Sequence, residues 1–435
     1  MEVTTRPPRV VTQTQQLVNR ARHVFPGGSV GNIYGDLIIR EGRGGHIFDV
    51  DGNEYIDFLL GSGPMLLGHA HPEVVEAVHS QIDAGTTFFV TSDQAILLAE
   101  QIVEAVPCAE LVRFTSSGTE ATHMAMRVAR AFRKRDRILK FEGAFHGSGD
   151  YALMSMAPKD PPAFPAAAPD SPGIPTSISE HMLIAPFNDS EVTRAIIEEH
   201  HDQMAGVMVE PIQRLIPPEP GFLSFLREVT EKYQIPLIFD EVVTGFRFAY
   251  GGAQEYYGVV PDLCAMAKAV GGGYPLAVVA GRAELMRHFD PAVGDDDKFV
   301  PQIGTLNGNP VAATAGLATL AVLRRKGTYE NLFALGRQLM EGLERSLRDV
   351  GLRAQVVGEP PMFDVYFTDE PIRDYRSTLL ADKQMLVRFN SLLLEQGVLK
   401  GDLKFYVSTA HTQEDVEFAM DAFKHVATIL AGRGR

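Results

Sequence analysis

The sequence is poor in cysteine, which limits how the chain can be stabilised. Among 435 residues only Cys108 and Cys264 are cysteines, and they lie far apart without the spacing of a zinc site. We therefore expect neither a disulfide framework nor a structural metal, and two isolated thiols are typical of a reducing compartment. The prediction is a cytoplasmic protein with a large apolar core.

Two further absences exclude classes of partner. The first residues, MEVTTRPPRVV, lack the apolar centre of a signal peptide, and no apolar run reaches the roughly 18 residues that a membrane span needs. Basic residues are in deficit, because 40 Lys and Arg stand against 55 Asp and Glu, which gives a net charge of −15. Nucleic acids and anionic membranes demand a basic surface, so the composition predicts neither partner and favours a small-molecule function.

Helical and β-rich segments alternate in the middle of the chain, from about residue 73 to 320. The β-rich segments are nearly continuous in apolar residues, which is typical of parallel strands covered on both faces: LVRFT, RILKF, MLIAPF, AGVMVEP and IPLIFDEV. Before them, apolar segments flank the turn Asp51-Gly52-Asn53, and after them amphipathic helices surround short strands. We predict an α/β protein with a large domain at 73–320 and a smaller α+β domain formed by 1–72 and 321–435.

A polar turn joins one predicted strand to a helix in RFTSSGTEATHM, residues 113–124. Ser117 and Thr119 there would present hydroxyls and free backbone N–H groups at a helix N-terminus, where a phosphate or another anion is stabilised. The same residues fit an ordinary helix cap that pairs with Glu120. The turn alone leaves both interpretations open.

Two charged residues stand at the ends of apolar segments. Asp240 stands near the end of the apolar segment IPLIFDEV, where a carboxylate needs a cation, a metal or a hydrogen-bond donor beside it. No third metal ligand follows Asp240 and Glu241 at a useful spacing, so no metal is predicted. Lys268 stands in the apolar run PDLCAMAKAV, and burial lowers the pKa of a lysine and makes it a nucleophile towards carbonyl compounds. The alternatives are a solvated strand end or a buried structural ion pair for Asp240 and, for Lys268, a side chain that extends to water. Glycines at 271–273 indicate that something bulky approaches the backbone.

Other segment ends carry groups suited to a planar, charged ligand. FEGAFHG offers Phe145 for stacking and His146 for hydrogen bonding, although core packing explains Phe145 equally well. AGVMVEP ends with Glu210, and the loop GTLNGNP carries Thr305, a further anion donor. An anion cradle, an aromatic face, a carboxylate and an amine nucleophile together match pyridoxal phosphate, which needs all four.

The order of these motifs resembles the class III aminotransferases of the fold-type I pyridoxal-phosphate enzymes, especially the branch that contains glutamate-1-semialdehyde aminomutase. The resemblance runs from about residue 44 to 416 and includes these motifs in order: SSGTEA, FEGAFHG, VEP, FDEVVTGFR, AKAVGGGYP and GTLNGNP. It implies a large domain with a mainly parallel seven-stranded sheet flanked by helices.

The resemblance also implies roles around the cofactor ring. Lys268 looks like the lysine that forms the Schiff base and shuttles the proton. Asp240 would hold the ring nitrogen protonated, with His146 as its brace. Phe145 would stack on one face of the ring and Val242 would close the other.

Further contacts follow from the same resemblance. Ser117, Gly118 and Thr119 would bind the cofactor phosphate. Thr305 would reach that phosphate from the neighbouring subunit, as in the family's homodimer. Glu210 falls where the family has an acidic residue near the cofactor.

One departure from the family concerns the substrate. In the aminomutase an arginine soon after the PGG turn holds the substrate carboxylate, whereas this chain reads PGGSVGNIYGDL and has no arginine there before Arg40. The candidate substitutes are Tyr34, Arg40, Lys400 and Lys404.

The sequence therefore predicts a pyridoxal-phosphate transaminase. It would move an amino group from an amine or amino acid donor to a keto acid acceptor in a ping-pong cycle. Loss of the family arginine favours this reaction over the alternative, an intramolecular aminomutase of the glutamate-1-semialdehyde type. Decarboxylation, racemisation and cofactor binding without catalysis are further alternatives.

Overall fold

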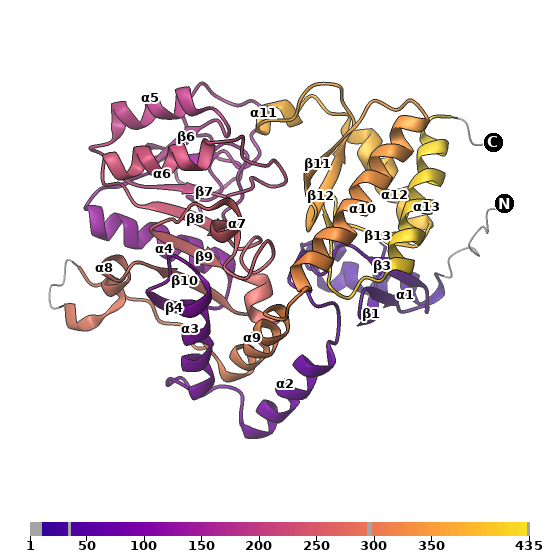
Figure 1. The fold of residues 1–435 in the computed structure, drawn as a ribbon, viewed down its shortest axis with the longest axis horizontal. Helices are drawn as coiled ribbons and strands as arrows, with labels where there is room; N and C mark the ends of the chain where they lie inside the picture. Colours follow the sequence, from indigo (N-terminus) through magenta and orange to yellow (C-terminus); the bar gives the residue numbers. More distant parts are fainter. Residues whose placement is uncertain (1–10, 34–35, 294–297, 433–435) are drawn as a thin grey trace.

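The computed structural model describes residues 11–33, 36–293 and 298–432, which form three β-sheets in two lobes (Figure 1). One lobe holds a seven-stranded sheet, and the other holds a four-stranded and a three-stranded sheet. Helix α2 (Pro72–Ala84) lies below both lobes in this view.

The large sheet has the strand order β4-β10-β9-β8-β7-β5-β6. Only β10 runs against the others, because its pairings with β4 and β9 are antiparallel, whereas β5–β6, β5–β7, β7–β8 and β8–β9 are parallel. The predicted mainly parallel seven-stranded sheet is thus confirmed. Its strands are β4 (Leu111–Thr115), β5 (Arg137–Phe141), β6 (Met182–Ala185), β7 (Met204–Val209), β8 (Leu237–Glu241), β9 (Leu263–Met266) and β10 (Ala277–Gly281).

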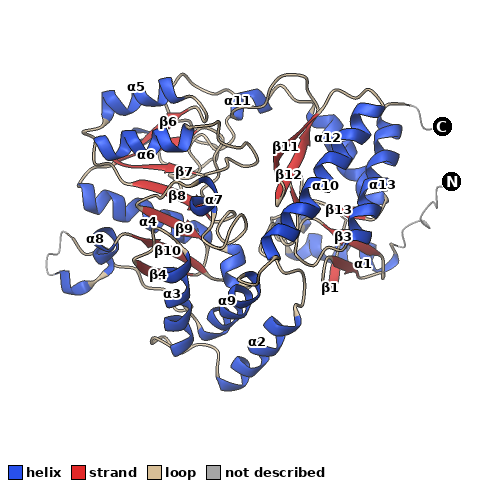
Figure 2. Ribbon diagram, viewed as in Figure 1, coloured by secondary structure: helices blue, strands red, loops and turns tan. Residues whose placement is uncertain are grey.

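Helices cover both faces of this sheet (Figure 2). Alternate side chains of a strand point to opposite faces, so Met208 of β7 packs with α4 residues such as Ala125, while Val207 and Val209 belong to the cluster that holds Leu98 of α3 and Leu226 of α6. Burial on both faces explains the nearly continuous apolar strands. The other helices of this lobe are α3 (Asp93–Ala105), α4 (Gly118–Arg133), α5 (Ser190–His200), α6 (Phe222–Lys232), α7 (Ala253–Tyr257), α8 (Ala283–Met286) and α9 (Pro310–Leu323).

The smaller lobe joins both ends of the chain. Strand β13 pairs in parallel with β3, so residues 398–399 extend the N-terminal meander, as expected for a lobe formed by both terminal segments. The division into domains at 72/73 and 320/321 stays a prediction. The elements are α1 (Thr12–Val24), β1 (Ile39–Arg43), β2 (His46–Asp49), β3 (Glu54–Asp57), α10 (Thr328–Asp349), β11 (Gln355–Glu359), β12 (Met362–Tyr366), α11 (Tyr375–Thr378), α12 (Lys383–Glu395), β13 (Val398–Leu399), β14 (Phe405–Tyr406) and α13 (Gln413–Leu430).

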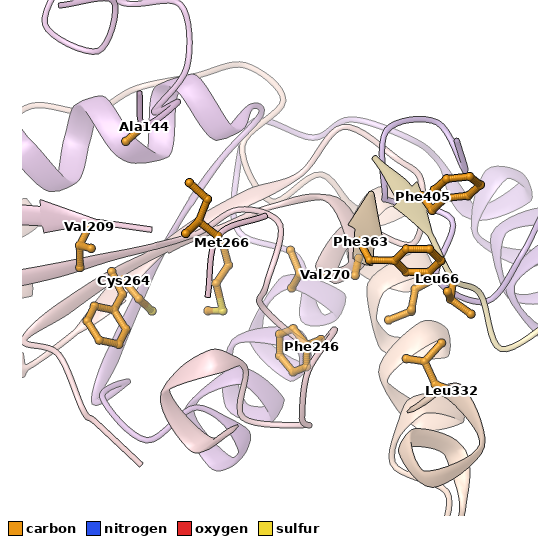
Figure 3. Close-up of a cluster of buried hydrophobic side chains, with 14 of the residues drawn as sticks. Leu66, Ala144, Val209, Phe246, Cys264, Met266, Val270, Leu332, Phe363 and Phe405 are labelled. Atoms are coloured by element: carbon orange, nitrogen blue, oxygen red, sulfur yellow. The ribbon is translucent and has the colours of Figure 1, made fainter. Parts of the chain in front are cut away.

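One apolar cluster runs through both lobes. Figure 3 shows it reaching from Val209 and Cys264 on the large sheet to Phe363 and Phe405 of the three-stranded sheet. The rings of Phe363 and Phe405 stack with centroids 5.1 Å apart. None of the helices in the described ranges is long and apolar enough to cross a membrane.

Candidate active site

A cavity of about 400 Å³ lies at the carboxyl edge of the large sheet. Parallel strands end at the same edge, so residues that follow β4, β5, β8 and β9 converge there although they are far apart in the sequence. The cavity contains eight of the residues that the sequence singles out: Ser117, Gly118, Thr119, Phe145, His146, Asp240, Val242 and Lys268.

Lys268 follows β9 and begins a short 3-10 turn. Its Nζ donates a hydrogen bond to the carbonyl of Ser62 at 2.8 Å, and the structure records no carboxylate partner for it among the described residues. Burial lowers the pKa of Lys268, and the positive charge of Lys404 adds to that effect, while Tyr406 opposes it. A lysine with these surroundings reaches its neutral, nucleophilic form more readily than an exposed lysine.

Asp240 and His146 form a buried pair at the floor of this cavity. His146 Nδ1 lies 2.7 Å from Asp240 Oδ2, and both side chains are at most 4% exposed. Asp240 Oδ1 accepts a second hydrogen bond from the Val242 backbone N–H at 3.0 Å. The carboxylate therefore holds a fixed position, and the predicted brace by His146 is present as a contact. His146 Nε2 is buried and has no hydrogen-bond partner among the described residues.

The turn before α4 presents the predicted anion cradle. Ser117 caps the helix, since its Oγ accepts a hydrogen bond from the Glu120 N–H at 3.3 Å. The helix cap is thus confirmed, whereas anion binding by the same residues, which line the cavity, stays a prediction. Gly118 is confined: a Cβ there would lie 3.0 Å from a Val242 methyl group. Gly147 has φ +98° and passes so close to Thr119 that any side chain would collide with it.

Phe145 and Glu210 lie beside each other at the ends of β5 and β7. The Phe145 ring is 42% exposed and lines the cavity, so core packing does not account for it. Glu210 accepts a hydrogen bond from the Phe145 N–H at 3.2 Å but does not line the cavity. Burial raises the pKa of Glu210, against the opposing positive charge of Arg214.

The remaining predicted residues lie outside this cavity. Thr305 occupies an exposed turn, so its predicted contact would need a second chain and stays a prediction. Arg40 is exposed on β1 and donates to Gln13 Oε1 at 2.9 Å. Tyr34 lies outside the described residues.

Lys400 is already saturated by the protein. Its buried Nζ lies 2.8 Å from each of three oxygens, which belong to Asp364, Asn390 and the Gly401 carbonyl. An ammonium group has three N–H donors, so none is left for a substrate carboxylate. Lys400 thus has a structural role here, contrary to the expectation that it could replace the missing arginine.

The glycines after Lys268 serve packing more than the cavity. A Cβ at Gly272 would lie 2.8 Å from the Ala315 carbonyl of α9, and Gly272 and Gly273 both have positive φ. Of the three, only Gly273 lines the cavity. The bulky group that the sequence predicts beside these glycines is, at Gly272, the neighbouring helix α9.

Two contributors to the site escaped the sequence patterns. The Ser62 carbonyl, which anchors Lys268, comes from the loop after β3, and GSG at 61–63 signals only a turn. Arg214 follows β7, and its guanidinium lies 5.5 Å from the centre of the Phe145 ring. Arg214 stands in the segment QRLIPPEP, which matches no recognised motif, so no signal in the sequence pointed to it.

Comparison with known proteins agrees with this geometry. The model of the aminotransferase class-III family matches residues 29–426. The chain belongs to the class-III aminotransferases. It is 45% identical over 428 residues to a glutamate-1-semialdehyde 2,1-aminomutase of Methanothermobacter thermautotrophicus, a match that covers 96% of this chain and 99% of that protein.

Solved structures show the same fold. An ω-transaminase from Sphaerobacter thermophilus superposes with a TM-score of 0.92 at 39% identity, covering 97% of this chain and 98% of that one. A transaminase with PLP bound gives a TM-score of 0.90 at 32% identity, covering 98% and 100% of the two chains. The family's enzymes use pyridoxal phosphate, which is the cofactor that the sequence motifs predict.

The names of the relatives bear on the choice between the two predicted reactions. Further curated relatives, at 38–40% identity, are also glutamate-1-semialdehyde 2,1-aminomutases. These names favour the alternative prediction, an amino shift within one molecule. They favour it over the main prediction, an amino transfer between two molecules. Enzymes of both kinds are among the relatives.

Proposed function

We propose that the 400 Å³ cavity binds pyridoxal 5'-phosphate and that the chain uses it to move amino groups on small carbonyl compounds. The observation that carries the proposal is the convergence of Lys268 with the Asp240–His146 pair and the Ser117–Thr119 cradle in one cavity. These donors suit the cofactor, because the helix N-terminus attracts a phosphate and the buried carboxylate suits a protonated ring nitrogen.

Bound pyridoxal phosphate supplies a carbonyl that combines with amines and a ring that withdraws electrons from the neighbouring carbon. Asp240 would lie beside the ring nitrogen, and His146 fixes the orientation of its carboxylate. Phe145 and Val242 confine a planar ring from opposite sides. Lys268 is the residue that would hold the cofactor through its carbonyl carbon, and its Nζ would carry a proton between adjacent carbons of the reactants.

Within this chemistry we propose the aminomutase reaction first. Its support is the 45% identity to a glutamate-1-semialdehyde 2,1-aminomutase over nearly the full length of both chains. Transfer between two molecules is the second candidate, supported by the absence of arginine between Arg22 and Arg40 and by the likeness to an ω-transaminase.

The deciding experiment gives the cofactor-loaded enzyme glutamate-1-semialdehyde without any keto acid. The aminomutase converts it to the isomer that carries the amino group on the adjacent carbon, in many turnovers. The transaminase instead stops after at most one turnover per active site and resumes when a keto acid is added. Lys268→Ala serves as the control: it should abolish the visible absorption of the bound cofactor. A Lys268→Ala protein with unchanged absorption and turnover contradicts the proposal.

We also propose that the enzyme is a homodimer in which Thr305 contacts the partner's cofactor phosphate. Large apolar side chains near this turn and before α3 support an interface, since Phe89, Val90 and Ile303 are 68%, 75% and 83% exposed. Sedimentation would show a species of twice the 47.6 kDa chain mass. A fully active monomer contradicts the proposal. The cytoplasmic location stays a prediction from the two free cysteines.

A further inference from the structure

A second cavity, of about 990 Å³, lies between the lobes, and at one end its lining residue Arg214 lies over the ring of Phe145, which lines the candidate active site. We propose that Arg214 and Lys404, at that end, bind the carboxylate of the amino substrate. This inference rests on the proposed function, since it names the part of the substrate that the site recognises.

Neither cation has an ion-pair partner among the described residues, and the recorded side-chain contacts are with aromatic rings, Phe145 for Arg214 and Tyr406 for Lys404. Arg214 and Lys404 line the cavity, and the structure records no hydrogen bond or ion pair for either side chain among the described residues. Arg247, the other cation nearby, instead donates from its two Nη atoms to the carbonyls of Gly63, Pro361 and Val407, while its buried Nε has no partner among the described residues. Two unpaired cations that face one cavity are an arrangement that a bound anion stabilises.

The two charges also act on each other. The pKa of Lys404 is lowered to about 7, first by burial and then by the positive charge of Arg214. The negative charge of Glu210 raises the pKa of Lys404 again, but Glu210 is not within ion-pair distance of either cation and accepts its hydrogen bond from the Phe145 backbone N–H. An incoming carboxylate between Arg214 and Lys404 would remove this repulsion.

The pair stands where a substrate would extend from the reacting carbon. Arg214 lies over the Phe145 ring, which lines the cofactor cavity, and the charge of Lys404 reaches Lys268. Beyond the pair the larger cavity is lined mainly by apolar side chains: Leu215, Ile216, Val365, Phe367, Leu386 and Leu394. The geometry therefore assigns the site a substrate that is an amino acid, with the carboxylate between the two cations and with room for an apolar group.

The test compares a carboxylate with its neutral isostere. Calorimetry on the cofactor-loaded enzyme measures binding of 3-phenylpropanoate and of 3-phenylpropanamide, which differ only in the charged group. We expect the wild-type enzyme to bind the acid at least ten-fold more tightly than the amide. Arg214→Gln and Lys404→Met should each reduce this preference by about ten-fold, the usual effect of losing a charge-assisted contact.

Lys159→Met is the matched control, because Lys159 is an exposed lysine on the lining of the same cavity. It should keep the preference for the acid. Equal binding of acid and amide by the wild type, an unchanged preference in Arg214→Gln and Lys404→Met, or an equal loss in Lys159→Met overturns the inference. A wild-type protein without the visible absorption of bound cofactor refutes the proposed function instead, and the two failures are thereby distinguished.

Discussion

A bidentate ion pair between Arg376 and Glu142 links the smaller lobe to the wall of the candidate active site. Arg376, on α11, donates from Nε and Nη2 to the two carboxylate oxygens of Glu142 at 2.7 and 3.0 Å. Glu142 is 3% exposed and stands three residues before Phe145, whereas Arg376 is 40% exposed. Arg376→Met leaves a carboxylate in a poorly hydrated position, because only the arginine side of the pair is open to water.

The cost follows from this asymmetry. Removing one partner of a fully buried pair costs about 3–5 kcal/mol, and exposed pairs contribute less than about 1 kcal/mol. With one partner buried and the other two-fifths exposed, we expect a loss of about 2–3 kcal/mol. Glu142→Gln combined with Arg376→Met should restore part of it, with a coupling energy of about 2 kcal/mol.

The assay is urea unfolding of the four proteins of this double-mutant cycle. Circular dichroism is the suitable signal, because the chain contains no tryptophan. Arg376→Lys, which keeps the charge but loses the bidentate geometry, should fall between the wild type and Arg376→Met. A coupling energy below about 0.5 kcal/mol would refute the argument, since the pair would then behave like an exposed one.

Three other predictions concern the cradle, the carboxylate site and acid stability. Gly118→Val should weaken cofactor binding by about ten-fold or more, because its Cβ would already lie 3.0 Å from Val242; spectral titration with an unchanged affinity would argue against the cradle. The preference for acid over amide should decline as pH rises through about 7, because Lys404 then loses its proton in the free site. Calorimetry across pH measures this decline, which Lys404→Met should not show. The other charged groups that face Lys404, and whose effects the measurement must allow for, are Arg214, Glu210, Arg247 and Asp240. Burial lowers the pKa of His411 to about 4, below its ordinary value of 6.5, so the unfolded chain binds the proton more readily than the folded chain. The contribution of His411 to stability is complete above pH 6.5 and should fall by up to about 3 kcal/mol as pH drops towards 4. Thermal unfolding measures this loss, and a His411→Gln protein with the same acid profile as the wild type would disprove it.

The grouping of the candidate cofactor residues was largely predictable because they stand at the ends of strands or shortly after them. Apolar runs identified β4, β5, β7 and β8, and parallel strands bring whatever follows them to one edge. Lys268, Asp240, Phe145 and the cradle could therefore be grouped before any coordinates were known. The antiparallel direction of β10 was not predictable in this way, because a buried apolar run has no direction.

The substrate side was harder to predict because it depends on contacts between lobes. Arg214 and Lys404 are far apart in the sequence and meet only when the lobes pack together. Nothing in the sequence distinguishes Lys400 from Lys404, yet the structure pairs Lys400 with Asp364 of β12 and records no hydrogen bond or ion pair for the Lys404 side chain among the described residues. This difference depends on where the two-residue strand β14, which directly follows Lys404, lies. A strand of two residues is too short to produce a periodic pattern in the sequence.

The two halves of the site also differ in how freely they can change. The residues proposed to hold the cofactor stand at the ends of strands of one hydrogen-bonded sheet or within a few residues after them, so a change in their positions disturbs the sheet. Arg214 and Lys404 occupy short turns, closed by the Gln213–Ile216 bridge and by the hydrogen bond from Gly401 to the Lys404 carbonyl. Substitution in these turns can exchange one acid for another while the amino chemistry stays intact. For laboratory redesign, residues 213–216 and 401–404 are therefore the positions at which new donors should be sought first.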